Sequence, residues 1–198
     1  SLRSMNNLAN SLDGHGRYAE AEELRRKTLE IRRRVLGEEH PNTLVSMNNL
    51  ANSLRDRGDY AEAEELHRKT LEIRRRVLGE DHPYTLASMY NLALSLNDQG
   101  RYAEAAELHH KTLEILRRVL GEEHPVTLLA MSGLASSLRR QGLYAEAEEL
   151  YRKALEIQRR VLGDEHRDTL LLMYNLAGCL NYQDRYAEAE NLFRKSLE

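Results

Sequence analysis

Histidine is the side chain in this sequence best suited to bind a metal ion or to transfer protons. Four histidines recur at intervals of 42 residues: His40, His82, His124 and His166. A zinc site needs three or four ligands that converge on one ion. Residues one repeat apart on packed helices are separated by roughly 8–10 Å or more, so these side chains cannot converge. We therefore predict no metal site, and we expect each histidine to organise a turn between repeats.

The carboxylates and the single cysteine offer no candidate for catalysis. Glu65 with Lys69 and Glu72 with Arg76 are spaced four residues apart, which predicts ion pairs along a helix. Cys179 occupies a position that is serine in the other copies of the pattern, which indicates a small packing residue. The chain contains no phosphate-binding loop, nucleophile elbow or zinc-protease motif. The sequence therefore predicts no enzyme and no cofactor.

Basic residues form short runs such as Arg74-Arg75-Arg76, which could suggest a nucleic-acid surface. Each run lies beside acidic residues, and no aromatic side chains alternate with it to stack on bases. We therefore predict a solvated, salt-bridged face and no nucleic-acid partner. The formal charge is only −3, and the sequence has neither a run of 18 apolar residues nor the pattern of a signal peptide. These features predict no membrane association and a cytoplasmic location.

The elements that carry these residues are repeated. Between residues 1–42 and 43–84, 33 of the 42 positions are identical. A fixed period of this length indicates stacked supersecondary units, none of which can bury its apolar face alone. We predict one solenoid domain over residues 1–198. It has four complete units and a truncated fifth: 1–42, 43–84, 85–126, 127–168 and 169–198.

Each unit has the spacing of two helices. Met47, Leu50 and Leu54 fall on one helical stripe, and the glycine in Arg57-Gly58-Asp59 is suited to end that helix. The second helix is predicted to begin near Tyr60, with Asp59 and Glu62 in the form of a capping box. The proline after each inter-repeat histidine fits the first turn of the next helix. The sequence therefore predicts an all-α chain of about ten helices without strands.

The motif Asn48-Asn49-Leu50-Ala51, followed by Gly58-Asp59-Tyr60-Ala61-Glu62-Ala63, resembles a tetratricopeptide repeat. The 42-residue length is similar to that of the repeats in kinesin light chains, and the resemblance covers the whole chain. It implies antiparallel helix pairs stacked in a right-handed superhelix, with the first helices on the inner surface. It also implies a protein or peptide ligand bound in the concave groove.

One face of the first helices varies between units more than packing requires, and it carries amides, tyrosines and leucines that suit a peptide. The resemblance further implies that Asn7, Asn49, Asn91 and Asn175 hold a bound main chain. The predicted groove residues are Asn6, Asn7, Asn10, Asn48, Asn49, Asn52, Arg55, Tyr90, Asn91, Leu94, Asn97, Arg139, Arg140, Tyr174, Asn175 and Tyr182.

An alternative is an engineered or fragmentary repeat scaffold without a specific ligand. The near-identity of the repeats favours it, and so does the abrupt start and stop of the chain, which lacks a polar capping helix. Such ends predict head-to-tail self-association, because each end carries the surface that the other end packs against inside the array.

Overall fold

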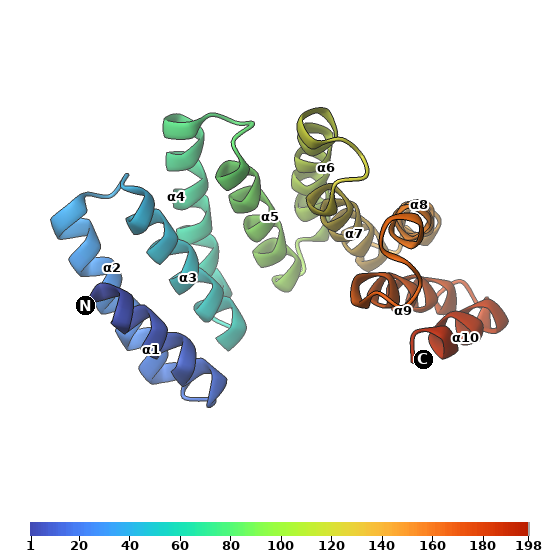
Figure 1. Ribbon diagram of the computed structural model, residues 1–198, viewed down its shortest axis with the longest axis horizontal. Helices are drawn as coiled ribbons and strands as arrows, with labels where there is room; N and C mark the ends of the chain where they lie inside the picture. The colour runs from blue at the N-terminus through green and yellow to red at the C-terminus, as the bar shows by residue number, and fades with distance from the viewer. Residues whose placement is uncertain (198) are drawn as a thin grey trace. The chain divides into compact units, whose positions relative to one another are not determined.

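A computed structural model describes residues 1–197, apart from the side chain of Arg3. Its contacts divide the chain into two compact units, Ser1–Gln99 and a second unit from Gly100 onward (Figure 1). The first unit contains α1 (Leu2–Gly14), α2 (Tyr18–Leu36), α3 (Pro41–Arg57), α4 (Tyr60–Leu78) and α5 (Pro83–Asp98). The second contains α6 (Tyr102–Leu120), α7 (Pro125–Arg140), α8 (Tyr144–Leu162), α9 (Arg167–Asn181) and α10 (Tyr186–Lys195). The predicted all-α fold is confirmed, since residues 1–197 form these ten helices and no strand.

The inter-repeat histidines cap helices, as predicted. Nδ1 of His40 accepts a hydrogen bond from the main-chain N–H of Asn42 at 3.1 Å, and His82, His124 and His166 make the equivalent bond at 3.2 Å. Each bond satisfies one of the N–H groups that the start of a helix leaves without a partner. Proline occupies the first turn of α3, α5 and α7, where its missing N–H is harmless.

The turn inside each repeat differs in one respect from the prediction. Gly58 adopts the left-handed conformation at the end of α3, with φ 95°. Asp59 does not cap α4, so the predicted capping box is wrong. Its ψ of 58° lies outside the extended region that capping residues usually adopt, and its carboxylate instead pairs with Arg57 at 2.6 Å.

The core of the first unit lies where α3 packs against α2 and α4. Met47, Leu50, Ala51 and Leu54 are at most 2% exposed, which confirms the predicted stripe. In the second unit α7 packs in the same way between α6 and α8, and its buried face carries Met131. α3 and α7 are thereby enclosed on one side by second helices. The opposite side of the first helices carries the face that varies between repeats, here called the variable stripe.

The arginine run of α4 is not uniformly solvated. Arg74 is 6% exposed, and its Nη1 donates to the main-chain oxygen of Tyr84 at 2.9 Å and to Oγ of Ser88 at 2.7 Å. The prediction of a solvated face is therefore wrong at this position. The two hydrogen bonds compensate for the burial of the charge. Burial also lowers the pKa of Arg74.

Ion pairs connect neighbouring repeats where pairs along one helix were expected. Lys69 pairs with Glu38 at 2.8 Å, and Arg76 pairs with Glu39. Both acids lie in the turn that precedes α3, so these lysine and arginine side chains of α4 hold the preceding turn. This arrangement differs from the predicted Glu65–Lys69 and Glu72–Arg76 pairs.

Candidate functional site

The variable stripe of the first unit begins with a pair of amides on α3 and α5. Nδ2 of Asn91 donates a hydrogen bond to Oδ1 of Asn48 at 2.7 Å. Asn48, Asn49 and Asn52 are half-buried on α3. The bond joins Asn91, one of the four asparagines expected to hold a bound main chain, to Asn48 of the neighbouring repeat, and it orients both side-chain amides. A bound main chain would meet amide groups that are already ordered.

Other predicted residues of the first unit are more enclosed. Tyr90 and Leu94 are half-buried, and burial raises the pKa of Tyr90 although nearby Arg55 opposes the shift. Asn97 is only 7% exposed, because α5 packs against both α3 and α4. It therefore offers almost no surface to a ligand, in contrast to the prediction. Arg55 is half-buried, and its Nε lies 3.4 Å from the carboxylate of Asp98.

On α1 the predicted residues have two different surroundings. Asn7 is exposed and Asn6 is half-buried. Oδ1 of Asn10 accepts a hydrogen bond from Arg25 at 2.9 Å, and the same guanidinium pairs with Asp13 at 2.6 Å. Because Arg25 is 6% exposed, Asn10 helps to satisfy a buried charge as well as facing solvent.

In the second unit the predicted stripe carries aromatic contacts. The rings of Tyr182 and Tyr144 stack with centroids 5.2 Å apart and an interplanar angle of 2°. The guanidinium carbon of Arg139 lies 5.8 Å from the centroid of Tyr182, in cation–π geometry. Tyr174 packs edge-on against Phe193 at 5.4 Å. Tyr174 and Tyr182 are about three-fifths exposed, so they present large apolar surfaces to solvent.

The two remaining predicted residues complete this face. Arg140 is exposed, and its guanidinium carbon lies 5.7 Å from the ring centroid of Tyr102. Asn175 is half-buried on α9. The structure thus places the predicted residues of the second unit on α7 and α9 and at the end of α9. Their chemistry is aromatic and cationic, whereas that of the first unit is dominated by amides.

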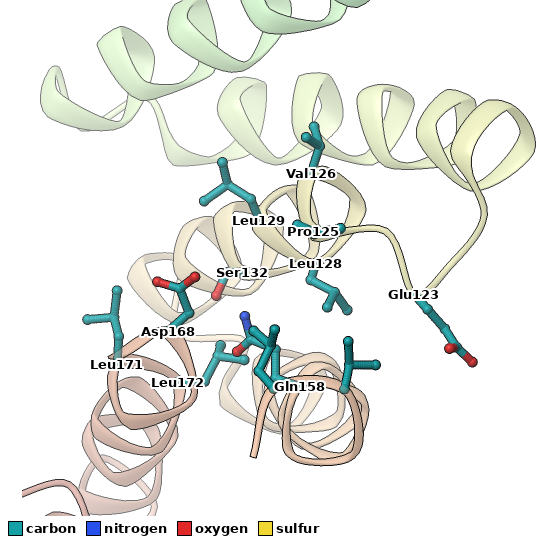
Figure 2. Close-up of a pocket in the computed structure, with 12 residues that line it drawn as sticks. Glu123, Pro125, Val126, Leu128, Leu129, Ser132, Gln158, Asp168, Leu171 and Leu172 are labelled. Atoms are coloured by element: carbon teal, nitrogen blue, oxygen red, sulfur yellow. The ribbon is translucent and has the colours of Figure 1, made fainter. Parts of the chain in front are cut away.

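A pocket of about 370 Å³ opens between α7, α8 and α9 (Figure 2). Val126 and Leu129 on α7 and Leu171 on α9 line it and are 45%, 50% and 57% exposed. These residues are missing from the predicted set. Their signal in the sequence is a large aliphatic residue at a position that varies between repeats. Leu129 and Leu171 correspond to Arg3, Val45 and Ala87, and Val126 corresponds to Asn42, Tyr84 and Asp168. Gln158 reaches into the same space from α8.

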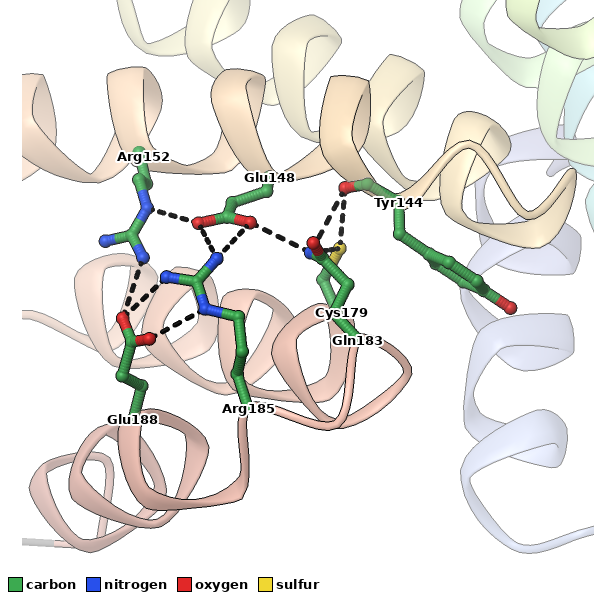
Figure 3. A network of polar contacts seen from close by, with 7 residues as sticks. All are labelled: Tyr144, Glu148, Arg152, Cys179, Gln183, Arg185 and Glu188. Atoms are coloured by element: carbon green, nitrogen blue, oxygen red, sulfur yellow. Dashed lines mark hydrogen bonds and ion pairs between the residues drawn. The ribbon is translucent and has the colours of Figure 1, made fainter.

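A network of polar side chains in the second unit is structural (Figure 3). Glu148 accepts hydrogen bonds from Arg152, Gln183 and Arg185 at 2.7–2.9 Å. Although burial opposes the shift, these bonds lower the pKa of Glu148. The cluster joins α8 to the turn between α9 and α10.

Cys179 is also structural, as predicted. It is fully buried, its Sγ donates to the main-chain oxygen of Tyr144 at 3.3 Å, and burial raises the pKa of its thiol. Within residues 1–197, no group of three or more histidine, cysteine or acidic side chains has the arrangement of a metal site. In the same residues, no helix is long and apolar enough to be a membrane span.

Comparison with known proteins agrees with the arrangement of repeated helix pairs. The family model described as tetratricopeptide repeat matches residues 1–74, 46–109, 85–142 and 127–198. A crystal structure of the nearly identical TPR-like repeats of a putative kinesin light chain from Podosopora anserina is 32% identical in sequence. It has a TM-score of 0.84, with 98% of this chain and 92% of that chain covered. BtubC (BKLC) from P. vanneervenii shares the fold, with 19% identity, a TM-score of 0.82, and 98% and 77% of the two chains covered. No curated protein matches the sequence.

Proposed function

Because the chain belongs to the tetratricopeptide repeat family, whose members are generally protein–protein interaction modules, we propose that it binds a polypeptide segment on the variable stripe of its first helices. The stripe comprises the exposed and half-buried side chains of α3 and α5 in the first unit and of α7 and α9 in the second. The ligand is a segment of another protein, bound in an extended or helical form, and no cofactor takes part.

The distribution of exposed apolar side chains carries this proposal. On the first helices, Leu129, Leu171 and Tyr174 lie away from the helix ends and are each at least half exposed. The second helices also expose large apolar side chains, such as Tyr18, Val35 and Val119, but these lie in the first or last turn. Among the residues that the structure describes, the middle turns of α2, α4, α6 and α8 expose none. A surface that is merely solvated would favour charged residues on both kinds of helix. Apolar side chains that are exposed away from the helix ends lie on the first helices, which supports a binding face there.

The polar groups of the stripe support a main-chain ligand. The amides of Asn48 and Asn91 are oriented by their mutual hydrogen bond, and Asn49 lies beside them on α3. Side-chain amides both donate and accept, as the peptide groups of a bound segment require. Tyrosines add large contact area at a small loss of conformational entropy. The combination supports recognition of a polypeptide better than recognition of a small molecule.

The proposal is tested by selecting phage-displayed random peptides against the chain and measuring the enriched peptides by fluorescence anisotropy. Tyr174→Ala should weaken their binding by about 1–2 kcal/mol, because exposed tyrosines at interfaces often contribute strongly. Asn49→Ala should weaken it by about 0.5–1.5 kcal/mol through loss of a hydrogen bond. Val119→Ala removes a similarly exposed apolar side chain from α6 and is the matched control.

Peptides that lose affinity with Val119→Ala but not with the two stripe variants would place the site on the second helices and overturn the proposal. Failure to enrich any peptide would also overturn it. The scaffold alternative makes a different prediction, because a self-associating chain would show a molar mass that rises with concentration in light scattering.

A further inference from the structure

One position near the end of each second helix reaches toward the start of the next first helix, and the chain fills it in three ways. In successive repeats this position carries Arg32, Arg74, Leu116 and Gln158. The residue that faces it on the next first helix changes at the same time: Ser46, Ser88, Ala130 and Leu172. Arginine thus occurs with serine, leucine with alanine, and glutamine with leucine. The fourth pair differs from the others in combining a polar residue with a large apolar one.

The second junction shows what this space can hold. The guanidinium of Arg74 enters it and donates to the main-chain oxygen of Tyr84 and to the hydroxyl of Ser88, at 2.9 and 2.7 Å. Arg32 makes the same two bonds in the first junction, at 2.8 and 2.7 Å. The start of a first helix therefore provides a site for a guanidinium group, and the repeat fold accommodates its burial.

In the fourth junction this space is open. Gln158 is shorter than arginine and Leu172 has no hydroxyl group, and the pocket of about 370 Å³ lies beside them (Figure 2). Gln158 is 8% exposed, and its Oε1 accepts no hydrogen bond from any residue that the structure describes. A buried acceptor without a donor is unfavourable, so a ligand that brings a donor into the pocket gains affinity.

The charges around the pocket favour a cationic donor. The carboxylate of Asp168 lines the mouth and is more than half exposed, with Nδ1 of His166 3.8 Å away. Glu123 also lines the pocket, but it is paired with Arg160 at 2.6 Å. The remaining wall is mostly aliphatic. An aliphatic wall with an acceptor inside and a carboxylate at the mouth matches an arginine side chain, whose stem is apolar and whose head only donates.

We propose that this pocket receives an arginine side chain of the bound polypeptide. Its stem packs on Leu129 and Leu171, and its guanidinium donates to Oε1 of Gln158 and pairs with Asp168. The partner thereby supplies in the fourth junction the group that the chain itself supplies with Arg74 in the second. This inference rests on the proposed function, since the pocket opens on the same variable stripe, and it specifies one residue of the ligand.

The test uses the peptides selected by phage display, each resynthesised with a fluorescent label. The enriched peptides should share an arginine at one position, and replacing it with citrulline, its neutral analogue, should weaken binding about tenfold. Gln158→Arg with Leu172→Ser rebuilds the pair of the second junction and fills the pocket. This variant should bind the arginine peptide about tenfold more weakly than the parent chain does and should no longer distinguish arginine from citrulline.

Two further variants keep the test decisive. Gln158→Leu removes the acceptor Oε1 without adding charge and keeps a side chain of similar size, so it serves if the first variant does not fold. It should likewise reduce the preference for arginine over citrulline. Glu149→Gln makes the same change in net charge as Gln158→Arg at an exposed position of α8, and it should leave binding unchanged. Peptides that depend on Tyr174 and Asn49 but show no arginine preference, or no response to filling the pocket, would overturn this inference and leave the proposed function standing. Failure to enrich any peptide would overturn both.

Discussion

The imidazole of His109 on α6 occupies the space in which a side chain at Gly133 on α7 would begin. A Cβ atom added to Gly133 would lie 2.8 Å from Cε1 of His109, closer than carbon atoms approach in proteins. His109 is fully buried, so its ring is surrounded by other protein atoms. The repeat that contains α7 thus carries glycine where the other repeats carry Asn7, Asn49, Asn91 and Asn175.

Gly133→Ala should therefore destabilise the chain by about 1–2 kcal/mol through overpacking, although alanine is normally the better helix former. The matched control is Gly178→Ala on α9, where an added Cβ would meet nothing within 4 Å. The control should stabilise by about 0.5–1 kcal/mol. Urea unfolding followed by circular dichroism measures both. Equal effects of the two changes would contradict the close contact.

The stability of the second unit should depend on pH through His109. Burial lowers the pKa of His109 from 6.5 to about 4, so between these values the unfolded chain binds a proton that the folded chain does not. The free energy of unfolding therefore has its full value above pH 6.5 and decreases as the pH falls towards 4, by at most about 3 kcal/mol.

Urea unfolding at a series of pH values between about 7 and 4.5, which span most of this window, measures the effect. His109→Leu should make the dependence shallower, whereas His110→Gln should not, because His110 is exposed. Some pH dependence should remain in His109→Leu because of His67. Burial and the nearby charges of Arg55 and Arg74 lower the pKa of His67 to about 4. An identical pH dependence in the parent and His109→Leu would refute the prediction.

Asp184 stands where other repeats place Gly16, Gly58, Gly100 and Gly142, and it has a φ of 60°. The left-handed conformation is unfavourable for residues other than glycine. Asp184→Gly should therefore raise the free energy of unfolding by about 0.5–1 kcal/mol. Gly142→Asp, in the same unit with φ 84°, should lower it by a similar amount. Thermal unfolding measures the stability of both variants. A change of the same sign in the two would argue against backbone strain at Asp184.

Ala51 lies fully buried where α3 packs against α4. Ala51→Leu should destabilise the chain by about 1–3 kcal/mol, because a close-packed interface cannot accept a larger side chain without shifting. Ala61→Leu places the same side chain at an exposed position of α4 and is the control. A melting temperature of Ala51→Leu that matches the control would show that the helix pair has room to adjust.

Much of the fold follows from local sequence patterns. The apolar spacing of Met47, Leu50 and Leu54 selects a helix and its buried face, and Pro41 and Gly58 mark where α3 begins and ends. These signals act over a few residues, so one copy of the repeat is enough to read them. Their recurrence every 42 residues then predicts the stacking of helices, because no single unit can bury its own apolar face.

Contacts between repeats settle what the repeat pattern leaves open. Asn48 and Asn91 are 43 residues apart, and only the packing of α3 beside α5 brings their amides to 2.7 Å. The burial of Arg74 and the open pocket beside Gln158 depend on which residue the next repeat places opposite, Ser88 or Leu172. Local patterns specify the helices and their buried faces, because spacing along one helix is enough to define them. The pocket and the enclosure of polar side chains on the stripe arise only where side-chain length and volume must match across a helix junction.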